Sequence, residues 1–248
     1  MSHSLENPAA RRDFAYRPPE DPCVELHRDA HVAVVVKPSG LLSVPGRAIE
    51  NQDSALYRVR LESPEAQAVH RLDMDTSGIL VIALNHEAAS ALGRQFQERS
   101  VRKLYLAWVD GEIDEGGAID APLRCDWENR PRQMVDHALG KRAVTLYLPL
   151  LQKDGRTLVA LEPVTGRSHQ LRVHMALKGH PILGDRFYAH PEAASAAPRL
   201  LLHASFLEFA HPAEKIQQAF RSLPDFAQEL GEVPDPGIMG SLLAPGLL

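Results

Sequence analysis

The chain has 248 residues, of which 44% are hydrophobic and 24% are charged, and its formal net charge is −5. This composition excludes collagen-like, coiled-coil and wholly disordered proteins, and the charge argues against a protein that coats nucleic acid with its whole surface. No run of about 18 apolar residues occurs, so we expect no transmembrane helix. Because residues 1–22 lack the apolar segment of a secretion signal, we expect a cytoplasmic protein.

Strand-like and helix-like runs follow one another irregularly along the chain. Strands are predicted at residues 31–36, 78–84, 104–109, 143–151, 157–163 and 200–209. Asn85 is suited to cap a helix over 86–98, and Ser168 to cap a shorter helix that ends at Gly179. The order lacks the strict strand–helix alternation of a doubly wound fold, so the predicted fold class is α+β with a mixed sheet.

The two ends of the chain differ from the middle in composition. Residues 1–21 are polar and contain proline, and residues 229–248 are rich in Gly and Pro. Such segments are typical of tails, so we expect one domain over 22–228 between an N-terminal tail and a flexible C-terminal tail.

Basic residues gather in three segments, 94–103, 124–142 and 167–178, although the total charge is negative. A solvated protein face would explain any one of them. All three segments lie close to the motifs described below. This arrangement favours contacts with phosphate groups over a solvated face.

Several common catalytic signatures are missing from the sequence. There is no GxxxxGK[ST], GxGxxG, HExxH or GxSxG, so nucleotide hydrolysis, dinucleotide binding, zincin and α/β-hydrolase chemistry lack their marks. Cys23 and Cys125 have no paired spacing, which predicts two reduced thiols. His169, His174 and His180 follow no ligand spacing either, so we expect no metal.

The most informative segment is 69–84, VHRLDMDTSGILVIAL. Asp73 lies there in a polar turn directly before a strongly apolar strand, where its side chain is presented at a sheet edge. A capped turn, in which Asp73 or Asp75 accepts backbone N–H groups, is the alternative interpretation from the residues alone.

The motifs HRLD and TSG, with KPSG upstream and TGRSHQLR downstream, resemble the RluA family of RNA pseudouridine synthases. KLYLAWV, HPILGDRFY and RLLLHA extend the resemblance over most of residues 30–210. CDWENRP and LLSVPGR resemble the branch that modifies both 23S rRNA and tRNA. The resemblance implies a catalytic domain, here expected at 22–228, built on a largely antiparallel sheet. Many relatives carry an S4-type RNA-binding domain before it, and with about 20 residues ahead of the first core segment we expect none here.

The family resemblance also implies catalytic roles. Asp73 matches the catalytic aspartate, and Arg172 matches the basic residue that pairs with it and favours its carboxylate form. Tyr105 matches the tyrosine that stacks on the base and assists removal of the C5 proton. The reaction needs no cofactor. The sequence leaves open whether the carboxylate attacks C6, attacks C1′ or promotes a glycal route.

The RNA partner implies further contacts. The target uridine must leave its stack, which is least costly in a loop, so stem-loops of 23S rRNA and tRNA are the expected substrates. Arg71 is suited to fill the space of the flipped base. Arg167 and His169 are expected to bind phosphates, and Lys37 and Arg47 carry weaker assignments of the same kind. We expect a monomer.

Two other functions are compatible with parts of the sequence. A non-catalytic RNA-binding or RNA-folding protein on the same scaffold would not need Asp73, Tyr105 and Arg172 together. A glycosidase that uses Asp73 and Asp75 would need carboxylates about 5 Å or more apart that flank one bond, which adjacent turn residues do not obviously provide.

Overall fold

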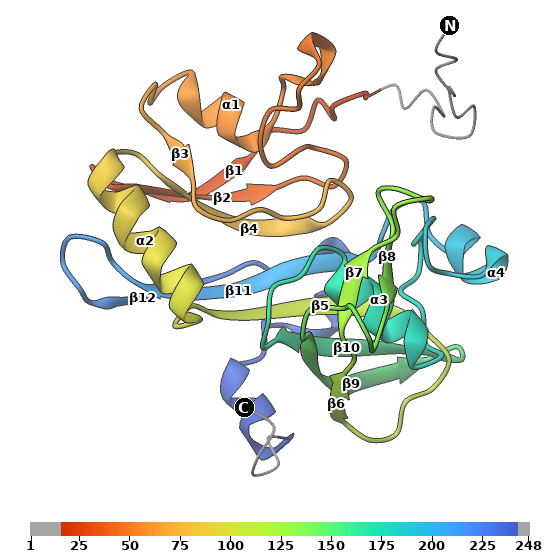
Figure 1. Cartoon of the computed structure of the whole chain (residues 1–248). Helices are drawn as coiled ribbons and strands as arrows, with labels where there is room; N and C mark the ends of the chain where they lie inside the picture. Colours follow the sequence, from red (N-terminus) through yellow and green to blue (C-terminus); the bar gives the residue numbers. More distant parts are fainter. Residues whose placement is uncertain (1–15, 243–248) are drawn as a thin grey trace, which may run out of the picture.

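The computed structural model describes residues 16–242 of the chain (Figure 1). The strands are β1 (Val24–Arg28), β2 (Val32–Lys37), β3 (Gln67–Ala68), β4 (Ser77–Ala83), β5 (Arg102–Asp110), β6 (Gly117–Asp120), β7 (Leu123–Cys125), β8 (Gln133–Val135), β9 (Val144–Lys153), β10 (Arg156–Pro163), β11 (Leu202–Ala210) and β12 (Gln217–Arg221). The helices are α1 (Ala55–Arg60), α2 (His86–Glu98), α3 (Gln170–Leu177) and α4 (Pro191–Ser195), with 3₁₀ helices η1 (Ile49–Asn51), η2 (Asp225–Leu230) and η3 (Pro236–Leu242).

A ten-stranded sheet runs through the molecule in the order β1-β2-β4-β11-β5-β10-β9-β6, with β3 beside β4 and β12 beside β11. Among the described strands, the pairing of β4 with β11 is parallel and the other pairings are antiparallel. β7 and β8 form a separate hairpin. The predicted α+β class with a mixed, largely antiparallel sheet is confirmed.

The parallel pairing of β4 with β11 depends on Gly78. This residue has φ +118°, and a Cβ atom there would lie 2.4 Å from both the backbone N and O of Ala204. Only glycine tolerates that approach and that backbone conformation. Because β11 also pairs with β5, the contact brings the turn before β4 close to Tyr105 on β5.

Local sequence signals located most of these elements. Asn85 caps α2, with its side chain accepting the N–H of Ala88, and the predicted strands lie within a few residues of those observed. The predicted Ser168 cap is wrong, because His169 holds the N-cap position of α3 with φ 54° and makes no side-chain cap bond. The side chain of Gln170 orders the turn instead by accepting from the N–H of Arg167.

The C-terminal segment, residues 231–240, packs on the sheet. Val233 and Met239 are buried in one cluster with Leu104 and Leu106 of β5. Just before it, the backbone O of Phe226 accepts from Trp108 Nε1 at 2.8 Å. The prediction of a flexible tail is therefore wrong for residues 231–240, because their apolar side chains bury the apolar face of β5. Residues 243–248 lie outside the described residues.

The described start of the chain is also attached to the domain. The Tyr16 hydroxyl donates to the backbone O of Asp53 and accepts from the N–H of Leu42. Residues 1–15 of the predicted N-terminal tail lie outside the described residues.

Cys23 and Cys125 are free thiols. Within residues 16–242, no helix is long and apolar enough to cross a membrane. The same residues contain no group of three or more His, Cys, Asp or Glu side chains placed to hold a metal ion.

Candidate active site

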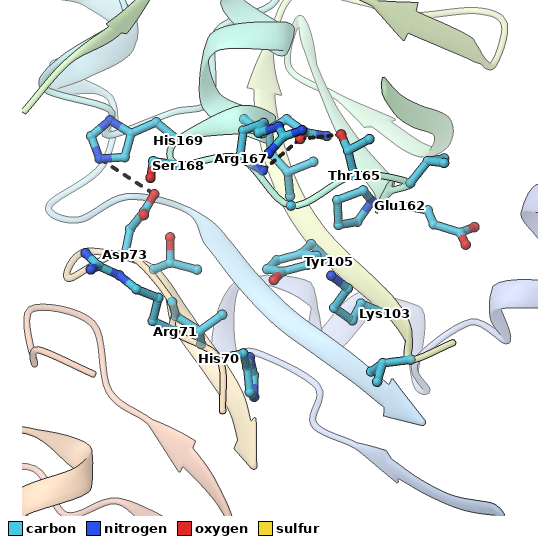
Figure 2. A pocket seen from close by; sticks show the side chains of 18 of the residues that line it. His70, Arg71, Asp73, Lys103, Tyr105, Glu162, Thr165, Arg167, Ser168 and His169 are labelled. Atoms are coloured by element: carbon cyan, nitrogen blue, oxygen red, sulfur yellow. Dashed lines mark hydrogen bonds and ion pairs between the residues drawn. The ribbon is translucent and has the colours of Figure 1, made fainter. Parts of the chain in front are cut away.

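Asp73 lies in the turn between β3 and β4, on the wall of a pocket of about 830 Å³. The turn is closed by a hydrogen bond from Thr76 N–H to Asp73 O. The Asp73 side chain is 22% exposed. The turn before β4, the end of α2, β5, the end of β10 and the start of α3 all contribute to the wall (Figure 2). The predicted turn therefore opens into a cavity.

Arg172 projects from α3 and is fully enclosed, with 2% of its side chain exposed. Its Nη1 lies 3.7 Å from Asp73 Oδ2, while Nε and Nη2 donate to the two oxygens of Asp185 at 2.7 Å. Burial opposes the charge of Arg172, but the hydrogen bonds to Asp185 outweigh burial and raise its pKa. The expected contact with Asp73 is present but long, and the principal partner is Asp185.

Asp185 was not predicted as a site residue. Its side chain is 0% exposed, and it also accepts the backbone N–H groups of Phe187 and Tyr188. Gly184 before it has φ +76°, and a Cβ there would lie 1.9 Å from the backbone O of Arg199. An acidic residue directly after such a glycine, in the motif HPILGDRFY, was the available signal.

His169 also faces the nucleophile candidate, with Nε2 at 3.8 Å from Asp73 Oδ2 (Figure 2). Its Nδ1 lies 2.6 Å from the Tyr188 hydroxyl, which accepts the Gln133 N–H at 2.8 Å. Burial raises the pKa of Tyr188 to about 12, so this hydroxyl keeps its proton and donates it to Nδ1. Burial also lowers the pKa of His169, which is therefore neutral with its own proton on Nε2, toward Asp73.

This position differs from the predicted phosphate contact. His169 belongs to a hydrogen-bonded chain that begins on β8, passes through Tyr188 and ends at the carboxylate of Asp73. Tyr188 and Gln133 were missed because the chain joins residues from distant parts of the sequence.

Tyr105 lies on β5 with its ring in the pocket wall (Figure 2). Burial, with a further contribution from the charge of Asp73, raises its pKa, so it is a neutral phenol near pH 7. A neutral aromatic ring in this position presents a surface on which a base can stack.

The three basic segments converge on this pocket. Its lining includes Arg99, Arg102 and Lys103 from the first segment and Arg142 from the second. Arg71 and the third segment complete the basic lining with Arg167, His169 and Arg172.

Lys37 is placed differently from its prediction. It is 0% exposed, and its ammonium donates to the backbone O of Pro38, Leu41 and Met74 at 2.7–2.9 Å. Burial lowers its pKa to about 7. Lys37 therefore ties the KPSG turn to the residue after Asp73 and does not reach a phosphate. Arg47 is exposed and does not line the pocket.

Comparison with known proteins gives a consistent result. Residues 31–177 match the family model described as RNA pseudouridylate synthase. The chain is 52% identical over 214 residues to the dual-specificity RNA pseudouridine synthase RluA of Escherichia coli (strain K12), covering 85% of this chain and 98% of that protein. Identity to the Yersinia pestis protein of the same name is 56% over 191 residues, covering 76% and 93%.

Solved structures agree with the sequence comparisons. Human RNA Pseudouridylate Synthase Domain Containing 1 superposes with a TM-score of 0.71 at 28% identity, covering 89% of this chain and 94% of that one. Human RNA Pseudouridylate Synthase Domain Containing 4 gives a TM-score of 0.64 at 26% identity, covering 82% and 89%.

Proposed function

This chain belongs to the RNA pseudouridylate synthase family, and we propose that it converts uridine to pseudouridine in compact stem-loops of two RNA classes, 23S rRNA and tRNA. The observation that carries the proposal is the surroundings of Asp73. Its carboxylate faces Arg172 Nη1 at 3.7 Å and His169 Nε2 at 3.8 Å, inside a pocket that also holds Tyr105. The dual-specificity name of its bacterial relatives supports two RNA classes.

The reaction is an isomerisation within one nucleotide. The bond between N1 and C1′ breaks, C1′ bonds to C5, the C5 proton leaves, and N1 takes up a proton. Asp73 is the proposed nucleophile in the routes that attack C6 or C1′, and in the glycal route its carboxylate promotes loss of a proton at C2′, so each route needs it ionised. No redox step or group donor enters this balance.

The groups around Asp73 have distinct proposed roles. Arg172, fixed by two hydrogen bonds to Asp185, supplies a positive charge that stays in place through the reaction. His169 donates from Nε2 to the same carboxylate. Tyr105 provides the stacking surface for uracil, and its raised pKa makes it a weak base at neutral pH.

RNA binding is proposed to use the basic lining of the pocket. Arg71 is exposed beside Asp73, where a planar guanidinium is suited to the space that the flipped base leaves. Arg167 is suited to a phosphate at the rim. We propose that the protein acts as a monomer, on RNA in the cytoplasm.

The test uses the purified protein and isolated stem-loops from each RNA. Release of tritium from C5-labelled uridine measures turnover, and chemical mapping locates the product. Turnover on both stem-loops is expected. Modification of one RNA class alone contradicts dual specificity, a requirement for assembled ribosomal particles contradicts recognition of a compact loop, and RNA binding without tritium release indicates a non-catalytic RNA-binding protein.

A further inference from the structure

Lys103 is one of the charged side chains in the pocket that have no individual role in the reaction proposed above. Lys103 lies on β5 two residues before Tyr105, so both side chains project from the same face of the strand. Both line the pocket, and Figure 2 shows Lys103 and Asp73 on opposite sides of Tyr105. Two residues of strand span about 6.6 Å, which separates Lys103 from the groups that would hold the reacting base.

The Lys103 ammonium has no hydrogen-bond acceptor in the described part of the chain. Among residues 16–242, no hydrogen bond or ion pair reaches its Nζ, which lies over the Phe96 ring at 6.0 Å from the centroid. Glu162 also lines the pocket, but it lies beyond ion-pair distance. Lys37 differs from Lys103 in this respect, because its buried ammonium donates to three backbone carbonyls.

The neighbouring side chain of His70 adds a second donor. Its Nε2 accepts the N–H of Val81 at 3.0 Å, and burial lowers its pKa to about 3, so the ring is neutral with its proton on Nδ1. The ring stacks on Phe96 at 4.4 Å. This end of the pocket therefore combines unused donors with an apolar wall.

An ammonium in such a place is suited to an anionic oxygen. Partial burial disfavours its charge and lowers its pKa, and a bound anion would reverse that effect. A lysine acts as a point charge that needs no bidentate geometry, which fits a phosphodiester better than a base edge.

We propose that Lys103 binds a backbone phosphate of a nucleotide that flanks the target uridine, at the end of the pocket away from Asp73. The proposal rests on the proposed function, because it assigns the ligand as RNA. It makes Lys103 a substrate-binding residue that contributes to RNA affinity and takes no part in the chemical step.

The first experiment compares Lys103→Met and Lys103→Arg with the wild-type protein on one stem-loop. Lys103→Met should raise Kd and KM about tenfold, with kcat at saturating RNA unchanged and the Arg variant largely restored. For Lys103→Met, the slope of log affinity against log salt concentration should be shallower than the wild-type slope by about 0.7. This is the value for the loss of one phosphate contact on single-stranded RNA. Lys153→Met, which removes an exposed lysine outside the pocket and outside the three basic segments, is the matched control and should change none of these.

The second experiment replaces the phosphates around the target, one at a time, with neutral methylphosphonates. Wild-type affinity should fall most at one flanking linkage, and Lys103→Met should be insensitive at that linkage alone. Equal sensitivity of the two proteins at every linkage, or a loss in kcat with KM unchanged, overturns the proposal.

A third measurement separates this proposal from the proposed function. Tritium release by the wild-type protein reports the function, whereas the methylphosphonate data are binding data. If the wild-type protein releases no tritium but its binding still depends on Lys103 at one linkage, only the proposed function is contradicted. If tritium is released but no linkage depends on Lys103, only the role of Lys103 is contradicted. Thermal unfolding of each variant confirms that it is folded.

Discussion

On one face of β5, Leu104 and Leu106 are fully buried against Phe206 and the C-terminal segment, whereas on the other face Lys103 and Tyr105 border the pocket. The residues alternate along a single strand, as the two-residue period of a strand requires. On the closed face the side chains are apolar and in contact. On the open face only the pocket-lining pair, Lys103 and Tyr105, is polar or aromatic, whereas Ala107 and Val109 farther along are buried in the core.

The two faces of β5 contribute to different properties of the protein, one to stability and the other to the chemistry of the pocket. Burial of apolar surface on the closed face contributes free energy of folding. On the open face the Lys103 ammonium contributes little to folding and is available to a ligand, and the Tyr105 ring packs against the core while it also lines the pocket. We therefore expect substitutions on the pocket side to change turnover and substitutions on the closed side to change unfolding.

The largest effect on the pocket side is expected from Asp73→Asn. Turnover should fall to the background of a tritium-release assay, because the amide keeps the volume but is not an anionic nucleophile. The side chain is partly exposed, so the free energy of unfolding should change by less than about 0.5 kcal/mol. The control is Asp75→Asn, whose carboxylate pairs with the exposed Arg186. Near-normal product formation by Asp73→Asn would refute the assignment, and an equal loss in Asp75→Asn would revive the two-carboxylate alternative.

Arg172→Ala should reduce both turnover and stability, because Arg172 lines the pocket and is also buried in the core. Turnover should fall almost as far as in Asp73→Asn. In addition, Asp185 would be left buried without its partner, which costs about 3–5 kcal/mol in urea unfolding. Asp185→Asn keeps the shape of the site and should reduce kcat with a smaller loss of stability. An unchanged rate for Arg172→Ala at neutral pH would remove Arg172 from the site.

On the closed side, Met239→Ala tests the C-terminal segment. Met239 is 1% exposed in the cluster that covers Leu104 and Leu106, and its truncation should lower the free energy of unfolding by about 2–4 kcal/mol. The kcat of the folded protein should not change. Unchanged stability together with reduced RNA binding would instead place this segment among the substrate contacts.

The smallest effect is expected from Tyr188→Phe, which breaks the chain from β8 to His169. Removing one hydrogen bond of about 0.5–1.5 kcal/mol should lower kcat two- to tenfold. Without the hydroxyl donor on Nδ1, His169 takes up a proton more readily, so its pKa rises. The contribution of His169 to the pH dependence of kcat should then move to higher pH than in the wild-type protein. Tyr57→Phe, at an exposed tyrosine, is the control. A purely structural role for Tyr188 predicts loss of stability with an unchanged pH profile.

The sequence by itself determined the elements whose signals are local. Residues 86–98 form a helix because an asparagine cap and an apolar face lie within one short segment. The strands of the central sheet were found from their apolar or alternating runs. The motifs around Asp73, Tyr105 and Arg172 also identified the family, because each motif is contiguous.

Tertiary structure alone decided how charged groups are paired. The sequence offers many acidic residues for Arg172, and only the fold selects Asp185, which lies buried beside it. The burial of Lys37 depends in the same way on three carbonyls, one of them 37 residues away. A hydrogen bond forms or fails over a few tenths of an ångström, and such distances are set here by the close approach of β4 to β11 and by the packing of α3, which no local pattern encodes.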